Sequence, residues 1–220
     1  MKTIFIITVA VFVMTGPVGV SYSVPNIWGV WDWGYNESVH VVVSPGGGGT
    51  PLTSAEFFGR ITTDATILVQ LWYQDDQPPE DPPPPEPVRN YPAEDIWLEI
   101  PGAFACLGGA TADGPTDSEG WFTFSLPLFM GGWNEPGGEL PLVFVNGSAL
   151  WDQDGAPISP TIVVNSPDIN ADLLVNLTDL ALFSVDFHGG YSFRSDFFWD
   201  GVIDLSDVVW MAVLMGDECP

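Results

Sequence analysis

Basic side chains are almost absent from this sequence. Its 220 residues include 29 Asp and Glu but only four Lys and Arg, so the formal net charge at pH 7 is −25. Nucleic acids and anionic membrane surfaces repel a protein of this charge. The composition therefore argues against binding to either and favours a cation as partner.

Cysteines and long apolar runs are also scarce. Cys106 and Cys219 are the only cysteines, so the chain cannot rest on a disulfide framework. Export would permit one bond between them, and two separate thiols are the alternative. No CxxC motif or Cys/His cluster indicates zinc. No apolar run reaches about 18 residues, the length of a membrane-spanning helix.

The abundant residues predict a folded, strand-rich protein. The sequence has ten Trp, 14 Phe and five Tyr, which a disordered acidic chain would lack. Its 24 Gly and 21 Pro favour short strands joined by turns over a helical bundle.

The first 23 residues have the layout of a secretory signal peptide. Lys2 gives a basic start, residues 3–14 carry no charge, and Gly16 and Pro17 break the run before the small residue Ser23. The alternatives are an uncleaved anchor and a buried N-terminal strand. Cleavage near Ser23 would leave a secreted chain without lysine.

Residues 24–164 are predicted to form an antiparallel β-sandwich of roughly seven strands. Apolar residues alternate in short runs, and turns rich in Gly and Pro separate the runs. A period of two is typical of a strand with one buried face. The runs lie at 39–43, 67–71, 96–100, 122–126 and 142–144.

One predicted loop, residues 74–89, is acidic and contains four consecutive prolines. Proline cannot donate to a sheet ladder, so this stretch is predicted to stay unpaired and to project as a stiff extension. A ligand for a proline-recognising groove is the alternative interpretation.

The segment Thr116 to Gly120, followed by residues 121–125, resembles the Thr-Asp-x-x-Gly hairpin of invasin-type bacterial immunoglobulin-like domains. The resemblance covers about residues 68–145, and the proline-rich loop replaces a short loop of that family. It implies an immunoglobulin-like β-sandwich that acts as a stalk, spacer or adhesion module and has no active site.

The C-terminal region contains a predicted calcium loop. Oxygen-bearing side chains occupy positions 1, 3, 5, 9 and 12 of a twelve-residue loop, and a backbone carbonyl falls at position 7. Calcium requires this pattern because it binds six to eight hard oxygen ligands. The ligand set is Asp168, Asn170, Asp172, Leu174 (carbonyl), Asn176 and Asp179.

The same frame recurs 28 residues later, with an apolar helix predicted after each copy. The second set is Asp196, Asp200, Val202 (carbonyl), Asp204 and Asp207. A solvated acidic tail with Asp-rich turns is the alternative, and two copies in register favour calcium sites.

This duplicated loop-helix unit, about residues 166–216, resembles the type I dockerin domain. Dockerins are small all-α calcium modules of secreted bacterial proteins that dock onto cohesin domains. The resemblance implies partner contacts at loop positions 10 and 11, which are Leu177, Thr178, Leu205 and Ser206 here.

Two positions depart from the dockerin pattern. Leu173 stands where the family has glycine, which predicts a strained backbone at a cost on the order of 1 kcal/mol. Phe198 stands where the family has an Asn or Asp oxygen, and water is the expected replacement. We therefore expect two calcium sites of unequal affinity.

Signals for catalysis are weak. His40 and His188 are the only histidines, and no Gly-x-Ser-x-Gly motif accompanies them. His40 falls on the outward phase of a valine strand, which predicts a surface position. A glycosidase carboxylate pair cannot be distinguished in so acidic a chain.

We therefore expect a secreted, non-catalytic bacterial protein with an immunoglobulin-like sandwich (24–164) and a dockerin-like calcium domain (165–220). The calcium domain would bind a cohesin-like partner or pack on its own sandwich, and the sandwich would be a spacer or adhesion module. The alternative is a carbohydrate-binding module of an extracellular polysaccharide-degrading system, with Trp97 and Trp121 as the sugar platform, beside Trp28, Trp31 and Trp33.

Overall fold

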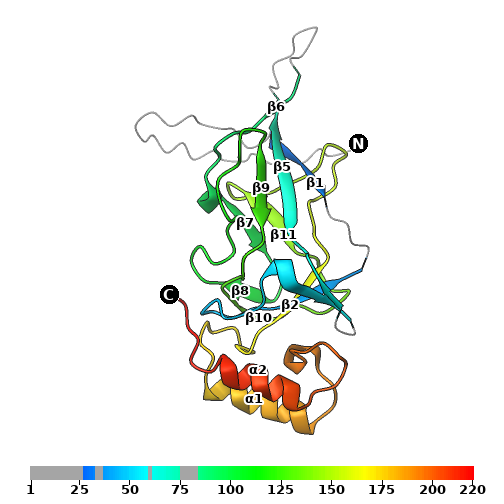
Figure 1. Cartoon of the computed structure of the whole chain (residues 1–220), viewed down its shortest axis with the longest axis vertical. Coiled ribbons are helices and arrows are strands. Elements are labelled where there is room, and N and C mark those ends of the chain that lie inside the picture. Colours follow the sequence, from blue (N-terminus) through cyan, green and yellow to red (C-terminus); the bar gives the residue numbers. More distant parts are fainter. Residues whose placement is uncertain (1–26, 33–36, 59–60, 75–83) are drawn as a thin grey trace, which may run out of the picture.

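The structure, a computed structural model, describes residues 27–32, 37–58, 61–74 and 84–220 (Figure 1). The predicted signal peptide, Trp33 and residues 75–83 of the proline-rich loop lie outside these residues. The described chain is mainly β, as predicted, and its two α-helices both follow the last strand. Within this part of the chain, no helix is long and apolar enough to cross a membrane.

The strands are short. They are β1 (Ile27–Asp32), β2 (Val39–Val42), β3 (Ala55–Phe57), β4 (Ile61–Thr63), β5 (Ile67–Tyr73), β6 (Glu86–Pro87), β7 (Ile96–Glu99), β8 (Ala103–Ala105), β9 (Trp121–Phe124), β10 (Met130–Gly132), β11 (Leu142–Val145), β12 (Ser148–Ala149) and β13 (Ile162–Asn165). The helices are α1 (Leu177–His188) and α2 (Leu205–Val213).

Strand β5 has the alternation that the sequence predicts. It pairs antiparallel with β1 and also with β9 and β6. Its residues Ile67, Val69 and Leu71 are fully buried, whereas Gln70 and Trp72 on the opposite face are only half-buried. The inward side chains join those of β7, β9 and β11 in one core. Each large side chain buried there contributes about 1.5–3 kcal/mol.

Strand β2 departs from the predicted antiparallel arrangement. It pairs in parallel with β13, from Val39 opposite Ile162 to Val42 opposite Asn165. Every residue of both strands is buried. The surface position predicted for His40 is therefore wrong, since this side chain is only 2% exposed. The reason is that residues after β13 cover the outer face, as parallel strands are usually covered on both faces.

The proline-rich loop also needs a correction. Its last residues were predicted to stay out of the sheet, but Glu86 and Pro87 pair with Tyr73 and Trp72 of β5. The pairing involves two residues only, and proline is tolerated in so short an edge strand.

The C-terminal residues form a separate layer at one end of the β-rich body. Figure 1 shows α1 and α2 side by side there, next to the end that carries β2, β8 and β10. The Gly-rich turn after β2 lies against the chain end: Ser44 donates a hydrogen bond to Asp217, and a Cβ on Gly46 or Gly48 would lie within 3 Å of Asp217 or Leu214 atoms.

A disulfide closes this layer onto the β-rich body. Cys106 and Cys219, whose pairing the sequence left open, are bonded across a separation of 113 residues. A cross-link over so long a loop removes much of the conformational entropy of the unfolded chain.

Replacing either cysteine should therefore lower the free energy of unfolding by about 4 kcal/mol. We expect Cys106→Ser, Cys219→Ser and the double variant to be equally destabilised in urea unfolding, because each removes the same bond. Two thiols that react with an alkylating reagent in the unreduced native protein would contradict the bond.

Candidate metal centre

Each helix begins at position 10 of a predicted calcium loop, three residues earlier than the sequence predicted, and loop position 9 is its N-cap. Asn176 Oδ1 accepts the backbone N–H of Thr178 at 2.6 Å, and Asp179 Oδ2 accepts the N–H of Asn176 at 2.9 Å. This reciprocal capping box satisfies backbone donors that the first turn leaves unpaired. Helix α2 repeats the arrangement with Asp204, Ser206 and Asp207.

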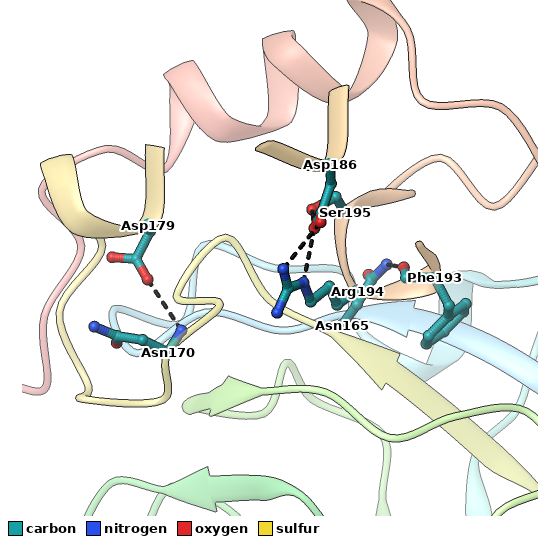
Figure 2. Close-up of polar contacts among 7 residues, drawn as sticks. All are labelled: Asn165, Asn170, Asp179, Asp186, Phe193, Arg194 and Ser195. Atoms are coloured by element: carbon teal, nitrogen blue, oxygen red, sulfur yellow. Dashed lines mark hydrogen bonds and ion pairs between the residues drawn. The ribbon is translucent and has the colours of Figure 1, made fainter. Parts of the chain in front are cut away.

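The first loop turns its carboxylates towards one point. Asp168 accepts the backbone N–H groups of Asp172 and Leu173 at 3.1 and 2.8 Å. Asp179 Oδ1 accepts the N–H of Asn170 at 3.1 Å (Figure 2). Carboxylate oxygens of Asp168, Asp172 and Asp179 all lie within 4.8 Å of one another.

The second loop repeats these bonds at the same loop positions. Asp196 accepts the N–H groups of Asp200 and Gly201 at 3.2 and 2.9 Å. Asp207 Oδ1 accepts the N–H of Phe198 at 3.0 Å. The duplication read in the sequence is therefore also a duplication of the local hydrogen bonding.

The backbone conformations repeat as well. Positions 4 and 6 have positive φ in both loops: +59° at Ala171 and +68° at Leu173, then +43° at Trp199 and +83° at Gly201. The strained conformation predicted for Leu173 is confirmed. Three of these four residues carry a β-carbon in the left-handed region, where it costs roughly 1–2 kcal/mol.

Four aspartates, the first and last of each loop, are completely buried. They are Asp168, Asp179, Asp196 and Asp207, each 0% exposed. Burial raises the pKa of Asp168 and of Asp207 to about 6, although backbone N–H donors oppose the shift. Burial raises the pKa of Asp196 as well.

Among the residues that the structure describes, no side-chain cation forms an ion pair with these four carboxylates. Residues 165–220 contain one arginine and no lysine, and Arg194 forms a bidentate pair with Asp186 at 2.7 and 2.9 Å (Figure 2). Although burial acts to raise the pKa of Asp186, hydrogen bonds from Arg194 and Ser195 lower it. No sequence pattern assigned this pair, which joins α1 to the residues just before the second loop.

The two loops differ at position 3 and in the side chain that contacts the first aspartate. Asn170 of the first loop accepts the N–H of Asp172 at 3.0 Å and supplies an oxygen that Phe198 cannot supply in the second. In the second loop the Tyr191 hydroxyl donates to Asp196 Oδ2 at 2.9 Å. These differences support the expectation of unequal sites.

Both loops are held against the β-rich body by the carbonyl of their first aspartate. Gly132 of β10 donates its N–H to Asp168 O at 2.8 Å, and the Asn165 side chain donates to Asp196 O at 2.7 Å. A β-carbon on Gly131 would lie 1.8 Å from Asp168 Oδ2, so glycine is required for this approach.

Asn165 links the second loop to the buried histidine. Its Oδ1 lies 2.9 Å from His40 Nε2, and its amide nitrogen also donates to Phe193 O. Burial lowers the pKa of His40 to about 4, with the Asn165 contact opposing the shift. Sequence reasoning missed Asn165 because the interaction depends on the parallel β2–β13 pair, 125 residues apart.

Three of the four positions predicted to contact a partner are exposed. Leu177 and Leu205 are 76% and 74% exposed, Thr178 is exposed and Ser206 is half-buried. On each helix, the residues four and eight positions after this leucine are also exposed, and together they form a stripe along one face of the helix. The two stripes are Leu177, Ala181 and Val185 on α1, and Leu205, Val209 and Val213 on α2.

The residues present fit a hard divalent cation. Their donors are carboxylate, amide and carbonyl oxygens, which calcium prefers, and nitrogen and sulfur ligands are absent from the set. Asn176 and Asp204 already cap helices, so they would reach a cation through water, as position 9 often does. No family model, curated protein or solved structure matches this chain.

Calcium binding should release protons at pH 5.5 and few at pH 7.5. In the metal-free folded state, Asp168 and Asp207 hold protons below their pKa of about 6, and a cation must displace them. Affinity should therefore fall as the pH decreases through about 6. Calorimetry in two buffers of different ionisation enthalpy measures the release, on the order of one proton per loop.

Proton release reports on the two carboxyls more directly than the pH dependence of the free energy of unfolding, because His40 opposes their effect on that free energy. Between about pH 4 and 6 the raised carboxyl pKa values favour the folded state at low pH, whereas the lowered pKa of His40 favours it at high pH. Asp168→Asn should remove only the release from the first loop. Equal release at both pH values would rule out the two carboxyls as its source.

Proposed function

We propose that this is a secreted, non-catalytic bacterial protein that binds two calcium ions and attaches to a partner through its calcium unit. One observation carries the calcium proposal: two copies of a loop bury their first and last aspartates, and no described residue places a side-chain cation against them. Burying an uncompensated carboxylate is costly, and a divalent cation removes that cost.

Bound calcium would crosslink the start and end of each loop. Asp168, Asn170, Asp172, Asp179 and the Leu174 carbonyl would hold the first ion, with Asn176 acting through water. Asp196, Asp200, Asp207 and the Val202 carbonyl would hold the second, with Asp204 acting through water. Because the last ligand of each loop caps a helix, the ion would also fix the helix direction.

The proposed fold of residues 165–220 is dockerin-like. In support, each calcium loop is followed by one helix, and the two copies share their caps, hydrogen bonds and positive-φ positions. The loops contact the β-rich body through Gly132 and Asn165, while the helix stripes are exposed. This arrangement supports packing on the chain's own β domain together with docking of a cohesin-like protein.

The proposed fold of the β-rich part is an immunoglobulin-like sandwich acting as a spacer or adhesion module. The hairpin that carried the resemblance has a physical basis. The buried Thr116 hydroxyl donates to Val88 O, and Asp117 Oδ1 accepts the N–H groups of Glu119 and Trp121. Gly120, at φ +84°, closes the turn.

The calcium proposal is tested by titrating the full mature chain. We expect two ions per chain, in two affinity classes, by equilibrium dialysis or calorimetry. Asp168→Ala and Asp196→Ala should each remove one class, because each deletes the first ligand of one loop. Calcium should also raise the melting temperature, since the ion binds the folded state alone.

Asp117→Ala is the matched control for both variants. Asp117 also accepts two backbone N–H groups in a turn, but it is exposed and lies in the β-rich part. It should leave both classes intact. Failure of the unaltered chain to bind calcium would refute the proposal.

The docking proposal predicts calcium-dependent binding to an immobilised cohesin module, from a panel screened by surface plasmon resonance. Val209→Asp places a charge in the exposed stripe and should weaken binding at least tenfold, as desolvating a charge in an apolar interface is costly. Leu126→Asp, at an equally exposed leucine of the β-rich part, should change nothing. Binding that survives calcium removal, or no binding across the panel, would refute docking without affecting the calcium proposal.

A further inference from the structure

The outer face of strands β1, β5 and β9 gathers tryptophans. The strand register places Trp28 opposite Trp72, and Gln70 opposite both Val30 and Trp121. Their strand neighbours, such as Leu71 and Phe122, are buried in the core. These five residues therefore share the opposite, outward face, where the three indoles are half-buried and Val30 is 37% exposed.

A fourth tryptophan extends this face beyond β1. Gly29 donates its N–H to Trp151 O at 2.9 Å, so residue 151 borders β1 on the edge away from β5. Leu150 is buried, and its side chain contacts the inner side of Gly29. Because neighbouring side chains of an extended segment alternate, Trp151 lies on the outward side, and it is 50% exposed.

Contacts within the face hold the indoles of Trp28 and Trp72 and the side-chain amide of Gln70 in place. The rings of Trp28 and Trp72 stack with centroids 5.9 Å apart and an interplanar angle of 14°. Trp72 Nε1 donates to Gln70 Oε1 at 3.1 Å, and Gln70 Nε2 donates to Glu119 O at 2.7 Å. Within the described residues, these two bonds leave one amide hydrogen and one lone pair of Gln70 for a ligand.

We propose that this face, defined by Trp28, Gln70, Trp72, Trp121 and Trp151, binds a neutral polysaccharide. Indole rings present flat apolar surfaces that match the C–H faces of pyranose rings, and a fixed amide between them pairs with sugar hydroxyls. The face crosses four neighbouring segments, so it suits an extended chain of sugars.

Charge selects the neutral ligand. None of the five residues is charged, in a chain that carries 29 carboxylates and a net charge of −25. An anionic polysaccharide would be repelled by that field, whereas a neutral one loses nothing. The proposed sugar site is separate from the calcium unit. It keeps Trp121 from the platform that the sequence suggested and replaces Trp97 with Trp28, Trp72 and Trp151.

The sequence suggested Trp97 and Trp121 as the sugar platform, but the two residues lie on different sheets. Trp97 stacks on Phe144 of β11, with centroids 5.6 Å apart, and Glu99 follows on the same face of β7. That carboxylate is exposed. Trp121 instead lies opposite Gln70 and belongs to the tryptophan face.

The test measures binding of the full mature chain to soluble β-glucan, xylan and mannan, with polygalacturonate as the anionic counterpart. Affinity electrophoresis ranks the ligands, and calorimetry measures the affinity for the best one. We expect binding to a neutral polysaccharide that Trp72→Ala weakens about tenfold or more, because one variant removes half of the stacked pair and the Gln70 contact.

Trp97→Ala is the matched control, since it removes another half-buried, outward, stacked tryptophan. It should leave binding unchanged, and near-ultraviolet circular dichroism checks that both variants are folded. Gln70→Ala should also weaken binding while keeping all four indoles.

Three results would overturn the proposal. They are no binding to any of the neutral polysaccharides, equal or tighter binding to polygalacturonate, and loss of binding in Trp97→Ala but not in Trp72→Ala. Self-association that Trp72→Ala abolishes, seen by size-exclusion chromatography, would assign the face to a second copy of the chain instead.

Discussion

The structure depends on how four buried aspartates are compensated. In each loop, the first and last carboxylates are removed from water and receive mainly backbone N–H groups in return, with the Tyr191 hydroxyl as an added donor to Asp196. Those same donors set the rest of the unit: they hold the loop closed, cap the following helix and fix left-handed residues at loop positions 4 and 6. These bonds act together with a small apolar core between the two helices and the loops, formed by Ile169, Val175, Phe183, Phe197, Met211 and Leu214 with Val42 of β2.

The repeated loop was predictable because its chemistry is local. The spacing of the oxygen-bearing side chains and the strain at Leu173 depend on residues within one loop, so the sequence contains them. The helix starts were predicted three residues too late, because the last aspartate of each loop lies in the first turn and completes the capping box. The inward phases of β5 and β9 were equally predictable from alternation. His40, Asn165 and the tryptophan face were not, because each depends on which strands become neighbours. Alternation identifies a strand's two faces, but it does not reveal that a distant segment covers the outer one.

The C-terminal unit, residues 165–220, is joined to the β-rich body at both of its ends. Asn165 is the last residue of β13 and at the same time a donor to the second loop, and near the chain end Asp217 accepts a hydrogen bond from Ser44 beside the disulfide. A change in the conformation of the second loop would therefore also disturb the packing of β2 against β13, because Asn165 contacts both. The exposed helix stripes and the tryptophan face, by contrast, lie on different elements, so the two proposed binding surfaces do not overlap.

The placement of the Cys106–Cys219 bond has a mechanical consequence. A protein that attaches one body to another is pulled at its attachment points, and a module joined by a single peptide linker would be peeled away from one end. Here a load on the helix stripes divides between β13, which enters the unit, and the covalent bond just beyond its last helix. The unit is therefore connected to the β-rich body at two points, and a pulling force would reach the β sheets without unfolding α1 or α2.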